Sequence, residues 1–312
     1  MTQIITWDRS MSSLGPAAVA IGVFDGVHLG HQTLIRDTIE FGRTLGSASA
    51  VVTFDQDPDR VVSPDSAVPQ LLDLADKLTF LAALGTDSIL VVPFDATLAA
   101  MCPEEFLQDV LLGAFDPVAT IVGHDFRFGC RASGDVGTLE RFGSEHGFTV
   151  IAHELVTLDG LPVTSTRVRS AVAAGDMLEA SRLLGRPHRL RGTVVHGRGE
   201  GAALGVPTAN LEVHHEAAVP ADGVYAGYTI VDDTRVPAAI SLGLPPTFPH
   251  ASARVEAHLI GWEGELYGRE IVVELIERVR AQRQFDSLSG LAEAIAHDIV
   301  LVEAMLSRED PA

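Results

Sequence analysis

The chain has 312 residues, 46% of them hydrophobic, and its mean hydropathy is +0.23. This length is enough for two domains that each bury a core, and the composition excludes a disordered protein. The formal net charge of −20 divides into −12 over residues 1–186 and −8 over residues 187–312. Because such a field repels phosphate backbones, general nucleic-acid binding is disfavoured, whereas a small phosphorylated ligand held by local donors is compatible with it.

The sequence has no sign of a membrane or secretion segment. No apolar run reaches the roughly 18 residues of a membrane helix, and the start, MTQIITWDRS, lacks the features of a secretion signal. The two cysteines, Cys102 and Cys130, do not have the spacing of zinc ligands or of a disulfide framework. We expect a cytoplasmic protein with small-molecule substrates, no nucleic-acid or membrane partner, and homo-oligomer formation left open. The single lysine, Lys77, is interpreted as a consequence of base composition.

Short apolar runs alternate with helical patterns through the first half of the chain. The predicted strands are 18–23, 49–54, 88–93, 118–122 and 148–152, and the predicted helices are 31–45, 73–84, 103–112 and 135–146. This alternation predicts an α/β domain with a doubly wound parallel sheet. In such sheets ligands bind beyond the carboxyl ends of the strands.

The second half of the chain has a different pattern. Two helices, 164–173 and 176–184, are predicted to close the first domain, and GRPHRLRG at 185–192 is interpreted as a linker. The strands predicted after it are 190–196, 223–231, 235–241, 253–261 and 270–278. They indicate a small antiparallel β-barrel, which an amphipathic helix over about 287–306 follows. The predicted domains are therefore 1–186 and 187–312.

A candidate site lies in AIGVFDGVHLGHQTLI, residues 20–35, where a predicted strand gives way to a helix. The first turn of a helix attracts phosphate, and imidazoles there can donate to phosphoryl oxygens as charge develops during transfer at an α-phosphate. Glycines at 22, 26 and 30 allow the backbone to approach a nucleotide. A buried histidine beside a capping histidine is the alternative, and it explains either His28 or His31 alone better than both. Zinc binding is also conceivable, but no further ligands stand near them in sequence.

A second segment, TSTRVR at 164–169, places hydroxyl groups at a predicted helix start and two arginines after them. Capping hydroxyls and a guanidinium together form a phosphate clamp that suits a leaving pyrophosphate. Such caps are common in helices without a function, so the segment gains weight only beside the histidine loop.

Four segments in this order, GVFDGVHLGH, VTFDQDP (52–58), GHDFRFG (123–129) and TSTRVR, resemble the adenylyltransferase module of bacterial bifunctional riboflavin kinase/FAD synthetases, within the HxGH nucleotidyltransferase superfamily. The resemblance implies the following site residues: ATP near Gly22, Phe24, His28, Gly30 and His31, its phosphates at Thr166 and Arg167, and flavin at Asp125, Phe126 and Phe128. The sequence departs from the family at Gln56 and Asp57, where a histidine is usual, and at His124, where an acidic residue is usual.

The second half holds its own candidate site in HGRGEGAALGVPTANLEV, residues 196–213. Glycines such as Gly197, Gly199 and Gly205 let backbone amides wrap phosphates. Thr208 and Asn210, two positions apart on a strand, face one side and can hold Mg²⁺ between their oxygens. Glu256, in an alternating strand, can take the proton from a hydroxyl that attacks a γ-phosphate. Taken alone, PTAN fits a β-turn equally well, and Glu256 fits a solvated strand residue better.

With DGVYAG (222–227), PTF (246–248) and LYG (266–268), these segments resemble the riboflavin kinase module, so the resemblance covers essentially the whole chain. It implies Mg²⁺–ATP bound by Thr208 and Asn210, and Glu256 as general base for the ribityl 5′-hydroxyl. It also implies that Arg280 and Phe285 lie beside the flavin.

The predicted function is therefore bifunctional: ATP-dependent phosphorylation of riboflavin to FMN, and adenylylation of FMN to FAD, both with Mg²⁺. Departures from the kinase pattern at Glu200, at Leu244-Pro245 and at Arg283-Gln284 leave an alternative open. In that alternative the protein is an FMN adenylyltransferase whose barrel binds flavin without turnover. Transfer to a pantetheine- or nicotinamide-type acceptor is a further alternative, which a complete kinase-like barrel disfavours.

Overall fold

The computed structural model describes residues 1–197, 205–243 and 255–308. It divides into two compact units, Met1–Ser165 and Thr166–Ala312. The first unit is a parallel α/β sheet and the second contains a closed antiparallel barrel with a terminal helix, so the predicted fold class is confirmed. No helix within the described ranges is both long and apolar enough to cross a membrane.

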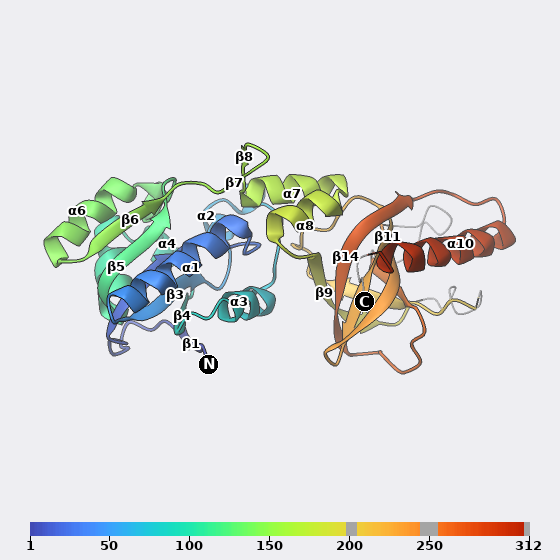
Figure 1. Cartoon of the computed structure of the whole chain (residues 1–312), viewed down its shortest axis with the longest axis horizontal. Helices are drawn as coiled ribbons and strands as arrows, with labels where there is room; N and C mark the ends of the chain where they lie inside the picture. Colours follow the sequence, from blue (N-terminus) through green and yellow to red (C-terminus); the bar gives the residue numbers. More distant parts are fainter. Residues whose placement is uncertain (198–204, 244–254, 309–312) are drawn as a thin grey trace. The chain divides into compact units, whose positions relative to one another are not determined.

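The first unit is built on six parallel strands in the order β1-β4-β3-β2-β5-β6 (Figure 1). Their bounds are β1 Gln3–Thr6, β2 Pro16–Ile21, β3 Ala48–Phe54, β4 Ser88–Val92, β5 Asp116–Gly123 and β6 Thr149–His153. From β2 the chain builds outward through β3 and β4, and later resumes on the other side of β2 with β5 and β6. The strand order therefore reverses between β2 and β5, and this switch point is where doubly wound sheets bind ligands.

Helices cover both faces of this sheet because the side chains of its buried strands are apolar on both faces. On one face α1 (Leu29–Thr44) and α3 (Leu74–Ala83) pack against Ala18 and Ala20 of β2. On the other, α4 (Ala96–Ala100), α5 (Pro103–Phe106), the π-helical turn η2 (Leu107–Leu112) and α6 (Val136–His146) pack against Val19 and Ile21. The remaining short elements are α2 (Asp59–Val62), η1 (Pro64–Ser66), η3 (Cys130–Ala132), β7 (Thr157–Leu158) and β8 (Leu161–Pro162).

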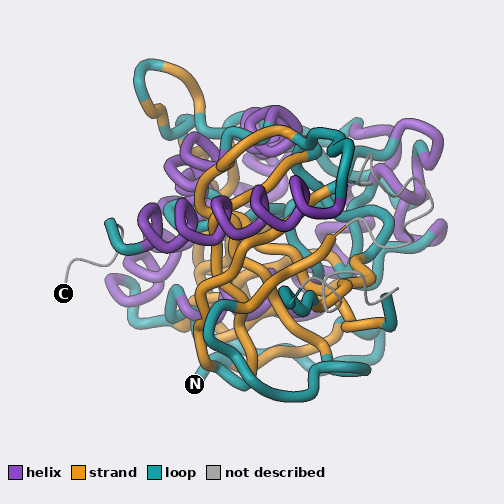
Figure 2. Tube along the Cα trace, turned by 90° about the vertical axis from the view of Figure 1, so that its right-hand side faces the viewer, coloured by secondary structure: helices purple, strands orange, loops and turns teal. Residues whose placement is uncertain are grey.

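The second unit contains a closed barrel in the order β10-β13-β12-β11-β14-β9. Its strands are β9 His188–Val195, β10 Ala209–Val213, β11 Gly223–Val231, β12 Thr234–Leu242, β13 Val255–Leu259 and β14 Glu270–Ala281. Helix α10 (Leu288–Leu306) crosses the barrel strands (Figure 2). Its Val302 and Leu306 are buried in one cluster with Tyr228 and Ile276 of the barrel. Helices α7 (Ser165–Ala174) and α8 (Met177–Leu184) precede β9.

The interpretation of 185–192 as a linker is wrong for residues 188–192, which form the start of β9. Burial alternates there because His188 and Leu190 face inward, whereas Arg189 and Arg191 face outward and pair with glutamates of β14. The linker interpretation rested on the arginines of this segment together with Pro187 and the glycines at its two ends. The domain boundary at 186/187 remains a prediction.

Candidate active sites

The two histidines of the first candidate site lie at the start of α1. His28 is the buried N-cap, its Nδ1 accepts a hydrogen bond from the His31 amide at 3.3 Å, and the two rings stack with centroids 3.5 Å apart. Because Nδ1 of His28 acts as the acceptor, its ring hydrogen in the neutral form lies on Nε2. The pair thus offers N–H donors where a helix of 16 residues has its positive end.

Two glycines allow the rings to pack this closely. A Cβ atom on Gly22 would lie 2.9 Å from Cζ of Phe24, and one on Gly30 would lie 3.1 Å from Cε1 of His28. Phe24 in turn meets His31 edge-on, with ring centroids 5.2 Å apart. Gly22 and Gly30 therefore make room for the rings of the site; the close approach of the backbone to a nucleotide that was predicted for them stays a prediction.

The loop between β2 and α1 has an unusual backbone. Phe24 and Val27 have φ of 55° and 41°, which side-chain-bearing residues rarely adopt. The buried Asp25 carboxylate accepts from the amides of Leu71 and Leu72 at 3.1 and 3.2 Å, and the Asp25 carbonyl accepts from Ser165 Oγ at 2.9 Å. The TSTRVR segment thus contributes a hydroxyl that holds the histidine loop.

Lys77 on α3 is a further polar group of this region, which the sequence interpretation missed. Its Nζ donates to the carbonyls of Phe54, at 2.6 Å, and Val23, at 3.3 Å. Burial lowers the pKa of Lys77 to about 8, against the opposing effect of nearby carboxylates, those of Asp25, Asp57 and Asp55. These carboxylates and Gln70 line a pocket together with Lys77.

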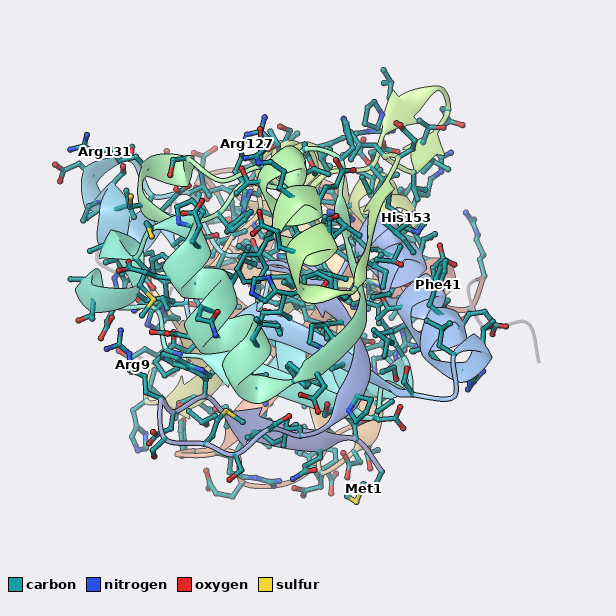
Figure 3. The ribbon with its side chains drawn as sticks, turned by 90° about the vertical axis from the view of Figure 1, so that its left-hand side faces the viewer. Met1, Arg9, Phe41, Arg127, Arg131 and His153 are labelled. Carbon is teal, nitrogen blue, oxygen red and sulfur yellow. The ribbon has the colours of Figure 1, made fainter. Side chains whose placement is uncertain are left out.

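The GHDFRFG loop follows β5, the strand beside β2, so it begins at the same edge of the sheet. Asp125 is exposed, and Phe126 is half-buried on the ring of Phe128 at a centroid distance of 5.2 Å. Phe128 itself is buried in the core. Figure 3 shows Arg127 of this loop, and Arg131 of η3 after it, along the upper edge of the first unit. Asp125 and Phe126 are therefore the predicted flavin residues that a ligand can reach, and Phe128 supports them.

Thr166 and Arg167, predicted to serve the phosphates, lie in the first turn of α7. The Arg167 guanidinium donates to Glu179 of α8 at 2.5 Å, so its position is set by a carboxylate of the same unit.

In the barrel, strand pairing brings the predicted kinase residues together. Asn210 on β10 pairs directly with Glu256 on β13, so their side chains are neighbours on one face. Thr208 immediately precedes β10. A Cβ atom on Gly197 would lie 2.3 Å from Nδ2 of Asn210, and Gly205 has φ of 78°. Gly199 and Glu200, and the departure at Leu244-Pro245 with PTF, lie outside the described residues.

Two family models cover these two regions: FAD synthetase matches residues 10–167, and riboflavin kinase matches residues 184–306. The bifunctional riboflavin kinase/FMN adenylyltransferase of Pseudomonas fluorescens is 37% identical over 302 residues, 95% of this chain and 96% of that protein. The chain belongs to the bifunctional riboflavin kinase/FMN adenylyltransferase family. The proteins of that name from Escherichia coli K12, 34% identical over 94% of both chains, and Bacillus subtilis, 31% identical over 90% of both, agree with this assignment.

A solved structure supports the fold across the whole chain. The crystal structure described as a macrolide-efflux protein from Streptococcus pneumoniae is 28% identical, with a TM-score of 0.85 over 96% of this chain and 98% of that one. As a family member the chain is an enzyme with riboflavin kinase and FMN adenylyltransferase domains, and its substrates are ATP, riboflavin and FMN. The predicted bifunctional enzyme is confirmed. The alternative, in which the barrel binds flavin without turnover, is not supported.

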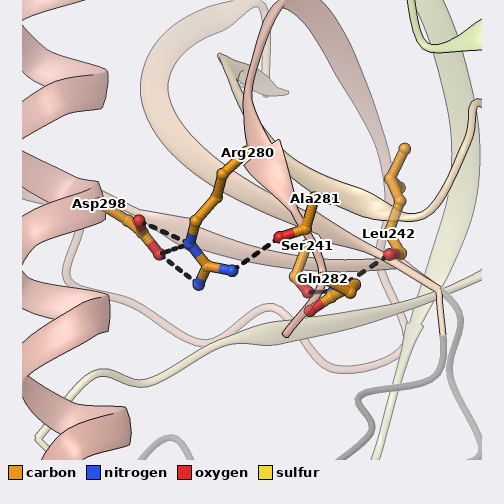
Figure 4. A network of polar contacts seen from close by, with 6 residues as sticks. All are labelled: Ser241, Leu242, Arg280, Ala281, Gln282 and Asp298. Carbon is orange, nitrogen blue, oxygen red and sulfur yellow. Dashed lines mark hydrogen bonds and ion pairs between the residues drawn. The ribbon is translucent and has the colours of Figure 1, made fainter. Parts of the chain in front are cut away.

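Of the two residues predicted to flank the flavin, Arg280 lies at the end of β14, and Phe285 lies four residues after the strand ends. The Arg280 guanidinium binds the buried Asp298 carboxylate of α10 through Nε at 2.9 Å and Nη2 at 2.7 Å (Figure 4). Gln282 donates to Ser241 Oγ at 2.8 Å, and Ser241 pairs with Glu256. Arg280 therefore fastens α10 to β14, and its guanidinium lies 5.8 Å from the Phe285 ring centroid.

Proposed function

We propose that His28 and His31 stabilise the charge that develops on the α-phosphate of ATP during FAD synthesis. A phosphate oxygen of FMN bonds to the α-phosphorus, the bond from that phosphorus to the bridging oxygen breaks, and pyrophosphate leaves. The observation that carries this role is the stacked pair at the start of α1, with the Nε2 hydrogen of His28 fixed by its Nδ1 contact. Hydrogen-bond donors oriented in advance toward developing charge are an effective source of rate enhancement.

Other residues of the first site have binding roles in this proposal. Gly22, Phe24 and Gly30 contact ATP, and Thr166 and Arg167 bind the phosphates that leave. Asp125 and Phe126 contact FMN, with Phe128 behind them. Supporting this, the histidine loop and the GHDFRFG loop follow adjacent parallel strands at the switch point of the sheet.

In the barrel, we propose that Glu256 is the general base for phosphorylation of riboflavin. Glu256 accepts the proton of the ribityl 5′-hydroxyl while that oxygen bonds to the γ-phosphorus, and ADP leaves. Gly197, Gly199 and Gly205 give backbone amides to the phosphates, and Arg280 and Phe285 lie beside the flavin. The support is the register that sets Glu256 next to Asn210.

The donor set of the barrel fits Mg²⁺. The Thr208 hydroxyl and the Asn210 amide offer neutral oxygens, which suit a hard cation that keeps part of its water shell. Gly197 leaves the space that the Asn210 side chain occupies. We propose that Thr208 and Asn210 hold Mg²⁺ with ATP in the kinase, where the ion neutralises phosphate charge; Mg²⁺ also accompanies ATP in FAD synthesis.

The test is a time course with purified protein, ATP and Mg²⁺, started from riboflavin in one reaction and from FMN in another, with riboflavin, FMN and FAD separated by chromatography. We expect FMN and then FAD from riboflavin. His28→Ala or His31→Ala should abolish FAD synthesis and spare FMN synthesis, and Glu256→Gln should do the reverse. Equal loss of both products in any of these variants contradicts the assignment of two separate sites.

We also propose a cytoplasmic location and a homo-oligomer for this protein. Sedimentation and cell fractionation test them.

A further inference from the structure

The only lysine of the chain lies beneath the loops of the adenylyltransferase site. Lys77 is 6% exposed, and its ammonium group binds the carbonyls of Val23 and Phe54. Phe54 is the last residue of β3, and Val23 is the second residue after β2. One side chain on α3 therefore joins the carboxyl ends of two neighbouring strands.

The loop that this lysine reaches needs to be held. Phe24, bonded directly to Val23, has φ of 55°, and Val27 has φ of 41°. Such a backbone is strained and persists only where its surroundings fix it. Asp25 binds the amides of the segment before α3, and Lys77 reaches back from α3 to Val23. The two links run in opposite directions between the loop and the same segment.

The positive charge of Lys77 lies among carboxylates that line the same pocket. Asp25, Asp55 and Asp57 line the same pocket, and Lys77 is the cation among the residues that line it. Arg60 also interacts electrostatically with Asp25 and Asp57. Loss of Lys77 would therefore remove one of the cations near these carboxylates and raise the negative charge beside a loop that receives a triphosphate. A neutral side chain of the same length could replace neither this charge nor the hydrogen bonds to the two carbonyls.

We propose that Lys77 is a positioning residue for FAD synthesis: through the carbonyls of Val23 and Phe54 it keeps the loop that carries His28 and His31 in its reactive geometry. The inference rests on the proposed roles of the two histidines. Lys77 acts through this loop, without contact to the reacting atoms. Replacement of Lys77 is therefore expected to affect FAD synthesis and not the phosphorylation of riboflavin.

The experiment compares Lys77→Met with a matched control, Thr86→Val, in the full chain. Thr86 is also buried and donates to two backbone carbonyls, those of Ser49 and Ser88, at the amino ends of β3 and β4. Both variants remove hydrogen bonds from the same sheet, but only Lys77→Met acts at its catalytic edge. The kcat and KM of both activities and the Tm are measured, with assays well below the Tm.

We expect Lys77→Met to lower the kcat of FAD synthesis from FMN on the order of 10- to 100-fold, since small misplacements of reacting groups have effects of that size. The KM for FMN and the kinase kcat should be unchanged. Thr86→Val should lower the Tm and leave both kcat values at their wild-type level. A Lys77→Met enzyme with wild-type kcat, or with parallel losses in both activities, overturns the proposal.

A second variant covers the case in which Lys77→Met does not fold. Thr53→Val removes the other side-chain bond to the Val23 carbonyl, 3.1 Å from Thr53 Oγ1, without a change in charge. We expect a several-fold loss of kcat in FAD synthesis alone, and an unchanged kcat contradicts the proposal. His28→Ala is assayed in parallel, because wild-type FAD synthesis in that variant overturns the proposed function whatever the Lys77 variants do.

Discussion

The two sites of this enzyme hold their functional side chains in different ways. In the first unit, His28 and His31 lie at the end of a loop with residues at positive φ, and hydrogen bonds that involve Asp25, Ser165 and Lys77 hold this loop. In the barrel, Asn210 and Glu256 lie on paired strands, and the backbone ladder itself sets their spacing. The first arrangement is sensitive to its supporting side chains, whereas the second is sensitive to whatever disturbs the space beside a strand.

The largest effect on the barrel site is expected from Gly197→Ala. The added Cβ would lie 2.3 Å from Nδ2 of Asn210, so either the strand end or the amide must move. We expect a loss on the order of 100-fold in kcat/KM for ATP in the kinase reaction, with FAD synthesis from FMN unchanged. Steady-state assays of both reactions check it, and a kinase at wild-type rate would show that the Asn210 position is unimportant.

The ion pair between Arg280 and Asp298 tests whether the second unit also depends on a contact between side chains. Arg280→Met and Asp298→Leu each leave one buried partner of the ion pair unmatched, with side chains 20% and 6% exposed. We expect each to destabilise the barrel by about 2 kcal/mol, and the double variant to lose less than the sum of the two. Urea unfolding of the four proteins checks the coupling. Additive losses would mean that the contact between Arg280 and Asp298 contributes nothing to stability.

The same variants test the predicted position of Arg280 beside the flavin. If the guanidinium contacts the flavin, the KM for riboflavin rises more in Arg280→Met than in Asp298→Leu.

A smaller effect is expected from Gly30→Ala in the first site. The new Cβ would lie 3.1 Å from Cε1 of His28, which a shift of a few tenths of an ångström relieves. We expect about a tenfold loss in kcat for FAD synthesis and an unchanged kinase. The same chromatographic assay measures both. A loss as large as that of Gly197→Ala would mean that the histidine loop adapts less than the strand end.

The smallest effect concerns pH and the barrel. Burial lowers the pKa of His188 to about 4, partly opposed by the hydrogen bond to the Ala218 carbonyl and reinforced by Arg186. The unfolded chain therefore binds more protons between pH 6.5 and 4, and stability falls as the pH falls through that window. From pH 7 to 5.5 we expect a loss of about 1 kcal/mol from this group.

The measurement uses Trp262 fluorescence in a Trp7→Phe background, which leaves one tryptophan, in the second unit, as the reporter. His188→Gln, which cannot titrate, should reduce the pH dependence by that amount. An equal pH dependence with and without His188 would assign it to other groups.

The sequence predicted the elements whose side-chain pattern is regular. The apolar runs of β2 to β6 and the paired histidines could be located from residue types alone, because buried parallel strands and helix starts have distinct compositions. Strand β1 was missed because three of its four residues are exposed. Residues 188–192 were interpreted as part of a linker, although the predicted strand 190–196 overlapped them, because Pro187, Gly192 and outward arginines gave the segment the composition of a loop.

Contacts between distant positions could not be predicted in the same way. Nothing local indicates that Arg280 binds Asp298, or that Asn210 pairs with Glu256. A lysine in a helix is ordinarily solvated, so the sequence did not indicate that Lys77 is buried and binds the carbonyls of Val23 and Phe54. Such contacts depend on strand register and on how helices pack against the sheet or barrel, and local residue patterns do not specify either.

The closed barrel has a consequence for how this enzyme tolerates change. Strand β10 pairs with β9 on one side and β13 on the other, so these five residues complete the ring and also carry Asn210. Loss of β10 would leave two unpaired strand edges, which are sites of intermolecular aggregation. Because the proposed Mg²⁺ ligand Asn210 lies on this strand, a change that displaces β10 would both expose these edges and disturb the proposed kinase site.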